Sequence, residues 1–95
     1  MENKEKLILI IKTIIKSQQD ILGPIAIDIA NRVNGLTVSK DLTSIDIEKA
    51  SKELLRDLVI AYDNIFGRAS VETCKNSIKP LIPTLGSIEL PDILK

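Results

Sequence analysis

Four carboxylates on or beside one predicted helix are the first residues whose types and spacing suggest chemistry. They are Asp46, Glu53, Asp57 and Asp63. Paired carboxylates supply the general acid and base of many hydrolytic mechanisms. Lysines and arginines alternate with these four along the chain, however, and would neutralise them locally. The pattern is typical of a solvated helix face, so it predicts no catalytic pair.

Other side chains that commonly carry enzyme chemistry are scarce. The 95-residue chain has no histidine and a single cysteine, Cys74, which excludes Ser-His, Cys-His and histidine-metal arrangements. Structural zinc needs about four ligands, mostly Cys and His. Cys74 falls on the apolar side of its predicted helix, where cysteine usually behaves as a small hydrophobe. We therefore expect no enzyme, no metal site and no cofactor.

The sequence also lacks the two usual means of holding phosphate groups. A phosphate-binding loop is rich in glycine and opens a helix, whereas the four glycines here are scattered near predicted turns and helix ends. Thirteen Lys or Arg residues balance thirteen Asp or Glu residues. Bulk charge would therefore not draw the chain to nucleic acid or to an anionic membrane.

Three residues near one predicted helix end could contribute to ligand binding. Tyr62 and Phe66, the only aromatic residues, lie one helical turn apart, and such a pair more often fills the core than lines a pocket. We expect both to pack in the core, with the tyrosine hydroxyl reaching solvent. A small-molecule sensing domain with a pocket lined by this pair is an alternative. Arg68 could meet an anionic ligand or acidic partner, or pair with a carboxylate such as Asp63.

Hydrophobic periodicity predicts a mainly α fold, a four-helix domain with a C-terminal tail. Apolar residues recur at three- and four-residue steps in four segments, which glycine or proline separates at residues 23–24 and at residue 67. The predicted helices span residues 4–22, 24–33, 48–66 and 69–81.

Two segments outside these helices have their own patterns. Residues 36–47 alternate between apolar and polar, which indicates a short β-hairpin or, equally, a loop with an early start to the next helix. The tail, residues 83–95, is too apolar for ordinary disorder, so we expect it to pack on the domain of residues 1–82 or on a partner. No apolar run reaches the roughly twenty residues of a membrane span, and the single cysteine favours the reducing cytoplasm.

A DNA-binding helix-turn-helix regulator is the alternative from another class. Residues 25–33, the turn after them and the next element resemble the opening of that motif. Residues 40–49, however, carry three carboxylates against two lysines, whereas an element that enters a groove exposes mainly basic and amide side chains. Nucleic acid is therefore not the expected partner.

Three glycine-containing strings resemble a known family. Residues 21–26 read Ile-Leu-Gly-Pro-Ile-Ala, residues 33–36 read Val-Asn-Gly-Leu, and residues 62–69 read Tyr-Asp-Asn-Ile-Phe-Gly-Arg-Ala. Over most of residues 7–81 the chain resembles the nitrosopumilus-type output domain of archaeal signal-transduction proteins. The resemblance implies an intracellular module that works with sensory or response-regulator proteins through contacts, and it offers no catalytic residues. The chain shows no receiver or kinase segment, which argues against a direct part in phosphorelay.

The leading hypothesis is a non-catalytic regulatory or protein-interaction module of intracellular signalling or transcription control, which acts by helix-face association. The first helix and the tail carry more apolar positions than a small four-helix core requires. A homo-oligomer, in the simplest case a dimer, is the expected use of this surplus, and a separate protein partner is the alternative. The candidate interaction residues are Leu7, Ile10, Ile14, Ile21, Arg68, Leu85 and Ile88.

Overall fold

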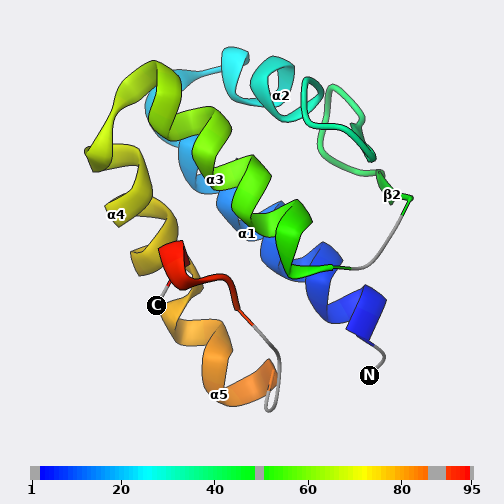
Figure 1. Cartoon of the computed structure of the whole chain (residues 1–95). Helices are drawn as coiled ribbons and strands as arrows, with labels where there is room; N and C mark the ends of the chain where they lie inside the picture. Colours follow the sequence, from blue (N-terminus) through cyan, green and yellow to red (C-terminus); the bar gives the residue numbers. More distant parts are fainter. Residues whose placement is uncertain (1–2, 49–50, 86–89, 95) are drawn as a thin grey trace.

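The predicted helical segments form helices, and the alternating segment forms a hairpin (Figure 1). The computed structural model describes residues 3–48, 51–85 and 90–94. The fold is mainly α with an antiparallel hairpin between α2 and α3, as the sequence predicts. In chain order the elements are α1 (Asn3–Leu22), α2 (Ile25–Ala30), β1 (Leu36–Val38), β2 (Ile45–Ile47), α3 (Lys52–Phe66), α4 (Arg68–Ile78), the 3₁₀ turn η1 (Lys79–Leu81), α5 (Ile82–Leu85) and the 3₁₀ turn η2 (Asp92–Leu94).

The first helix has a wide apolar face because it packs against several neighbouring elements. α1 packs against α2, α4 and β2, so side chains pointing in several directions from it are buried together. Full burial of an isoleucine side chain stabilises the fold by roughly 1.5–3 kcal/mol. The apolar residues of α1 with no exposed surface are Ile10, Ile11, Ile14 and Ile15.

This burial corrects the prediction that Leu7, Ile10 and Ile14 belong to an interaction surface. All three lie in the core, with exposed fractions of 5%, 0% and 0%. The prediction assumes that the apolar face of α1 is wider than a small core requires. Contacts with α2, α4 and β2 bury that face instead. Ile8 and Leu9, at the margin of this face, are partly buried against the same core.

The hairpin is short, and it is stabilised from outside its own ladder. Its register pairs Leu36 with Ile47 and Val38 with Ile45. Asn31, directly after α2, donates from its amide nitrogen to the Val38 carbonyl (3.0 Å) and accepts from the Val38 N–H (2.7 Å). An isolated two-stranded ribbon is marginal in water, and this side chain ties it to the helical layer. Because the element after α2 is β1, no helix-turn-helix forms at this point.

The loop of the hairpin is organised around Asp41. Its carboxylate accepts hydrogen bonds from the Thr43 hydroxyl (2.7 Å), the Ser39 hydroxyl (2.9 Å) and the Thr43 backbone N–H (3.2 Å). Hydrogen bonds from Thr43 and Ser39 lower the pKa of this exposed carboxyl. The next residue, Leu42, takes a left-handed φ of 63°, which is unusual for leucine. Its side chain is buried, and that burial offsets the backbone cost.

α2 and α3 are both shorter than the periodicity predicts. α2 ends at Ala30 because Asn31 engages β1 and the chain then turns through Gly35 at φ 84°. α3 begins at Lys52, four residues after its predicted start. The Glu48 N–H donates to the Gly35 carbonyl (2.9 Å) and so prolongs the hairpin, and Ser51 is still extended.

The C-terminal segment is partly inside the domain. α4 passes into η1 at Pro80, which lacks the N–H that an α-helix requires, and α5 covers the start of the predicted tail. At the end of the chain, η2 packs against α3 and α4, and Leu94 is buried in the core. The described end of the tail therefore packs on the domain. Ile88, a predicted interaction residue, lies outside the described residues.

Tyr62 is the largest fully buried side chain, and it joins α3 to α2. Its hydroxyl donates to the Ala26 carbonyl at 2.7 Å. The prediction that this hydroxyl reaches solvent is therefore wrong: α2 covers it and supplies the acceptor that a buried hydroxyl requires. Phe66 and its neighbour Ile65 are also not core residues, because they are 39% and 47% exposed.

Removing this hydroxyl tests the link between α2 and α3. We expect Tyr62→Phe to lower the free energy of unfolding by roughly 1–3 kcal/mol, since the buried Ala26 carbonyl loses its side-chain donor. Urea unfolding followed by circular dichroism measures the change. Phe66→Tyr is the control, because it alters one hydroxyl at an exposed site and should change stability by less than about 0.5 kcal/mol. Equal stability of Tyr62→Phe and the parent would contradict the role of the bond.

Candidate interaction surface

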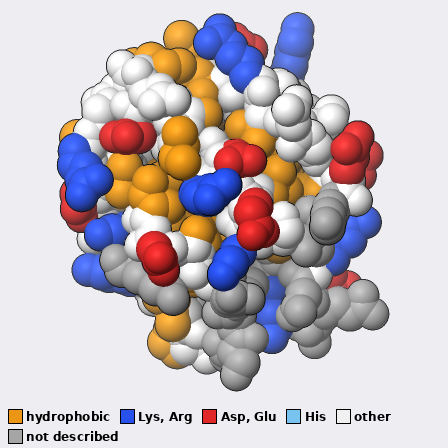
Figure 2. All heavy atoms as spheres, in the orientation of Figure 1, with side chains coloured by type: hydrophobic (Ala, Val, Ile, Leu, Met, Phe, Trp, Pro, Cys, Tyr) orange, Lys and Arg blue, Asp and Glu red, His pale blue; other side chains and the backbone are white. Residues whose placement is uncertain are grey.

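Exposed apolar side chains gather at one end of the domain. Among the described residues, five large hydrophobic side chains are exposed. Four of them flank the two places where one helix turns directly into the next, and Figure 1 shows both places at the upper end of the molecule. Figure 2 shows hydrophobic side chains reaching the surface at this upper end, and others over the middle of the same face. We call these four the junction patch: Ile21, Ile25, Ile65 and Phe66.

The first junction, between α1 and α2, depends on a glycine followed by a proline. Gly23 takes a left-handed φ of 77°, and its N–H donates to the Gln19 carbonyl (2.8 Å), which ends α1 in the usual way. Pro24, at φ −59°, precedes the first residue of α2. Ile21 before this turn and Ile25 after it stay 64% and 42% exposed.

The second junction, between α3 and α4, also depends on a glycine that ends the preceding helix. Gly67 takes φ 81°, and its N–H donates to the Asp63 carbonyl (2.8 Å). The Ser70 N–H in turn donates to the Gly67 carbonyl (3.0 Å), so α4 begins at once. Ile65 and Phe66, in the last turn of α3, lie directly before this junction and are exposed.

The hydrogen bond of Tyr62 fixes the two halves of the patch relative to each other. Tyr62 lies one helical turn before Phe66, and its acceptor Ala26 is the neighbour of Ile25. A directional bond of 2.7 Å between buried groups allows little sliding of α2 along α3. The patch is therefore preorganised, which reduces the conformational entropy lost on binding.

The charged residues beside the patch have opposite signs. Asp20 precedes Ile21, and Arg68 follows Gly67 as the first residue of α4. Both residues are exposed. Within the described part of the chain no ion pair joins Arg68 to Asp63, the carboxylate with which the sequence could pair it. The guanidinium is therefore open to an external partner.

Two of the seven interaction residues predicted from the sequence lie at this surface. Ile21 belongs to the patch and Arg68 lies beside it, whereas Leu85 is the last residue of α5. Ile25 and both residues of the last turn of α3 were not predicted. The signal for them was the glycine stop itself, since Ile25, Ile65 and Phe66 all lie within two residues of Gly23 or Gly67.

The aromatic pair does not form the ligand pocket considered from the sequence. Tyr62 has no exposed surface, so it lines no open cavity, and its hydroxyl is already bonded. Phe66, one turn further on, is on the outside of the domain. The aromatic residues thus divide between core and surface.

Cys74 lies in the core beside the one buried side-chain amide of the described residues. The Gln18 amide donates to the Ser70 carbonyl (3.2 Å) and to Cys74 Sγ (3.3 Å), which joins α1 to α4. Burial raises the pKa of the Cys74 thiol to about 11. A neutral, covered thiol is a poor nucleophile, so the prediction that Cys74 packs as a small hydrophobe is confirmed.

Comparison with protein-family models, with curated proteins and with solved structures finds no match to the chain. The resemblance to archaeal output domains therefore stays a prediction. Among the described residues there is no group of three or more Cys, Asp or Glu side chains placed to hold a metal ion. Within the same residues, no helix has both the length and the apolar character for crossing a bilayer.

Alkaline pH should destabilise the protein through Cys74. Burial raises the thiol pKa from 9.0 to about 11, whereas the unfolded thiol ionises near its ordinary pKa. Between these values only the unfolded chain releases the proton. The contribution to stability is therefore complete below about pH 9 and declines as the pH rises toward about 11.

The variant Cys74→Ala isolates this effect. Its free energy of unfolding, measured with urea at a series of pH values, should fall less steeply over this window than that of the parent. Burial also raises the pKa of Tyr62, and the Cys74 charge adds a smaller effect in the same direction; the part due to burial is common to both proteins. Parallel pH profiles would contradict a buried, neutral thiol.

Proposed function

We propose that the chain is a non-catalytic interaction module of intracellular signalling or transcription control, and that it associates with a second copy of itself through the junction patch. The observation that carries the proposal is the concentration of exposed apolar side chains: four of the five large ones among the described residues lie in the patch. Exposed apolar surface of this kind marks sites of association on soluble domains.

A second copy suits the shape and charge of this end of the molecule. In an interface with two-fold symmetry the same surface is used by both subunits, so one apolar patch covers the other. Asp20 and Arg68 beside it carry opposite charges, so the patch has no uniform charge that would repel its copy. A standard interface takes about 800 Å² from each partner, roughly a seventh of the 5556 Å² accessible surface.

Two of the three strings that resemble archaeal output domains also support a role through contacts. The string of residues 21–26 contains Ile21 and Ile25, and the string of residues 62–69 contains Ile65 and Phe66. The hydrogen bond from Tyr62 to Ala26 joins one string to the other. All four residues of the patch therefore come from the resembling strings.

Charge insertion at the patch should abolish self-association. The parent chain should show a mass that rises toward that of a dimer with concentration in multi-angle light scattering. Ile65→Lys should stay monomeric and folded, because a buried unpaired ammonium is costly at an interface. Ile82→Lys is the matched control, since Ile82 is 42% exposed against 47% for Ile65 but lies on α5, away from both junctions.

Two results would overturn this assignment. A parent chain that is monomeric at every concentration would contradict self-association. The patch would then be assigned to the binding of a different protein. A dimer that Ile82→Lys disrupts and Ile65→Lys leaves intact would place the interface on another surface.

A further inference from the structure

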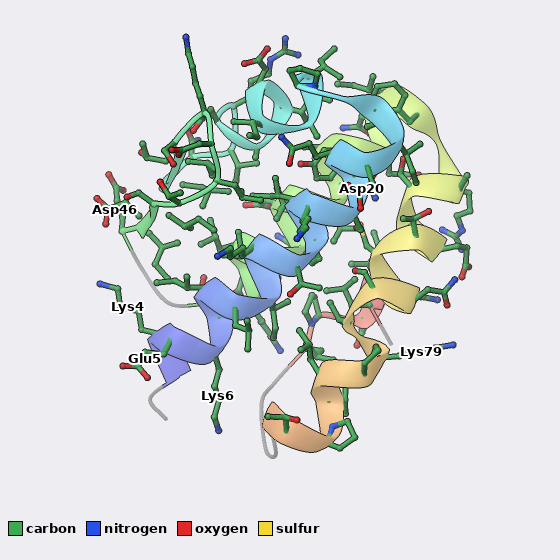
Figure 3. All side chains as sticks on the ribbon, turned by 180° about the vertical axis from the view of Figure 1, so that it is seen from behind. Lys4, Glu5, Lys6, Asp20, Asp46 and Lys79 are labelled. Carbon is green, nitrogen blue, oxygen red and sulfur yellow. The ribbon has the colours of Figure 1, made fainter. Side chains whose placement is uncertain are left out.

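The net charge of zero conceals an uneven distribution over the structure. The described parts of α1, α4 and η1 carry seven basic and three acidic residues, whereas residues 25–48 and 51–66 carry four basic and seven acidic ones. α1 and α4 pack side by side, and Figure 3 shows them together from behind, with Lys79 just beyond α4. The helices α1 and α4 with η1 therefore carry a basic excess despite the balanced composition.

A groove runs between α1 and α4. It has a volume of about 370 Å³, and Lys12 and Lys16 line it one helical turn apart on α1. Leu9 provides an apolar contact next to the lysines, and Asp20 lies at the end toward the junctions. We call this hollow the lysine groove; it is bordered on the α4 side by Ser77.

The hydroxyl groups in the groove are already committed as donors. Thr13 donates to the Leu9 carbonyl (2.8 Å), Ser17 to the Ile14 carbonyl (2.7 Å) and Ser77 to the Cys74 carbonyl (2.8 Å). Their oxygens can still accept hydrogen bonds but cannot donate to an anion. Among the lining side chains, only the ammonium groups of Lys12 and Lys16 are left to hold negative charge.

Among the residues that the structure describes, neither Lys12 nor Lys16 forms an ion pair. Like charges at positions i and i+4 of a helix repel each other, with side chains about 5–6 Å apart. Two carboxylates with the same spacing, on one face of another helix, would match the pair and remove the repulsion.

We propose that the lysine groove binds an acidic amphipathic helix of a partner protein, at a surface separate from the junction patch. Glutamates one turn apart on that helix contact Lys12 and Lys16. An apolar residue between the glutamates covers Leu9. Asp20 favours a basic residue at one end of the bound segment. Asp20 also repels a continuous phosphate backbone. The groove lining has neither the arginines nor the aromatic side chains that nucleic-acid grooves commonly use.

Fluorescence anisotropy with a synthetic helix tests the assignment. The probe is a labelled peptide with glutamates at positions i and i+4, repeated over three turns, with leucine between them and one lysine at an end. We expect the full chain to bind this peptide at low salt and more weakly as salt rises. A peptide with glutamine in place of each glutamate should not bind.

Matched charge reversals locate the site. The double variant Lys12→Glu and Lys16→Glu should weaken binding roughly tenfold or more, since two favourable pairs become repulsive. The control, Lys4→Glu with Lys79→Glu, makes the same change in net charge at exposed positions of α1 and η1, outside the groove (Figure 3). It should retain the parent affinity within about twofold. Circular dichroism checks that both variants are folded.

Three outcomes would overturn the proposal. The first is no binding of the glutamate peptide at low salt. The second is an equal loss of affinity in both double variants, which would indicate attraction by general charge. The third is tighter binding of a duplex DNA of the same net charge that depends on Lys12 and Lys16, which would assign the groove to nucleic acid.

Discussion

The hydrogen bond from Tyr62 to Ala26 constrains the rest of the structure. The remainder of the core is aliphatic, and aliphatic packing is non-directional, so it leaves helices some freedom to slide. Among the described hydrogen bonds, this one joins α2 to α3, and the Gln18 amide plays the same part between α1 and α4. The position of α2 in turn sets where Asn31 meets β1. A single buried hydroxyl thus links the core, the hairpin and the exposed end of the domain.

Much of the fold could be predicted because local sequence patterns determine it. The apolar periods give α1 to α4, the glycines at 23 and 67 give the helix ends, and the alternation over residues 36–47 indicates the hairpin as one of two alternatives. Long-range contacts decided what the patterns could not. The side chain of Asn31 shortens α2 by pairing with Val38, and the bond from Glu48 to Gly35 delays α3. Both contacts depend on the tertiary position of the hairpin.

The candidate surface was harder to predict for a related reason. The apolar surplus of α1 suggested an exposed face, but a helix with three neighbours buries residues such as Ile10 and Ile14. Phe66 follows the same helical period as the core residues, and only the abrupt end of α3 beyond it leaves the ring outside. Periodicity gives the direction of a side chain around a helix. It does not say how far along the helix the neighbours extend.

The most direct test of the account is the distance between two copies at the junction patch. A spin label on Ile65→Cys, or in a second sample on Ile82→Cys, can be introduced selectively because Cys74 is buried and its thiol pKa is raised. Pulsed dipolar spectroscopy then measures the separation of the labels. The account predicts strong coupling at position 65 and much weaker coupling at position 82. Strong coupling at position 82 with none at position 65 would contradict association through the patch.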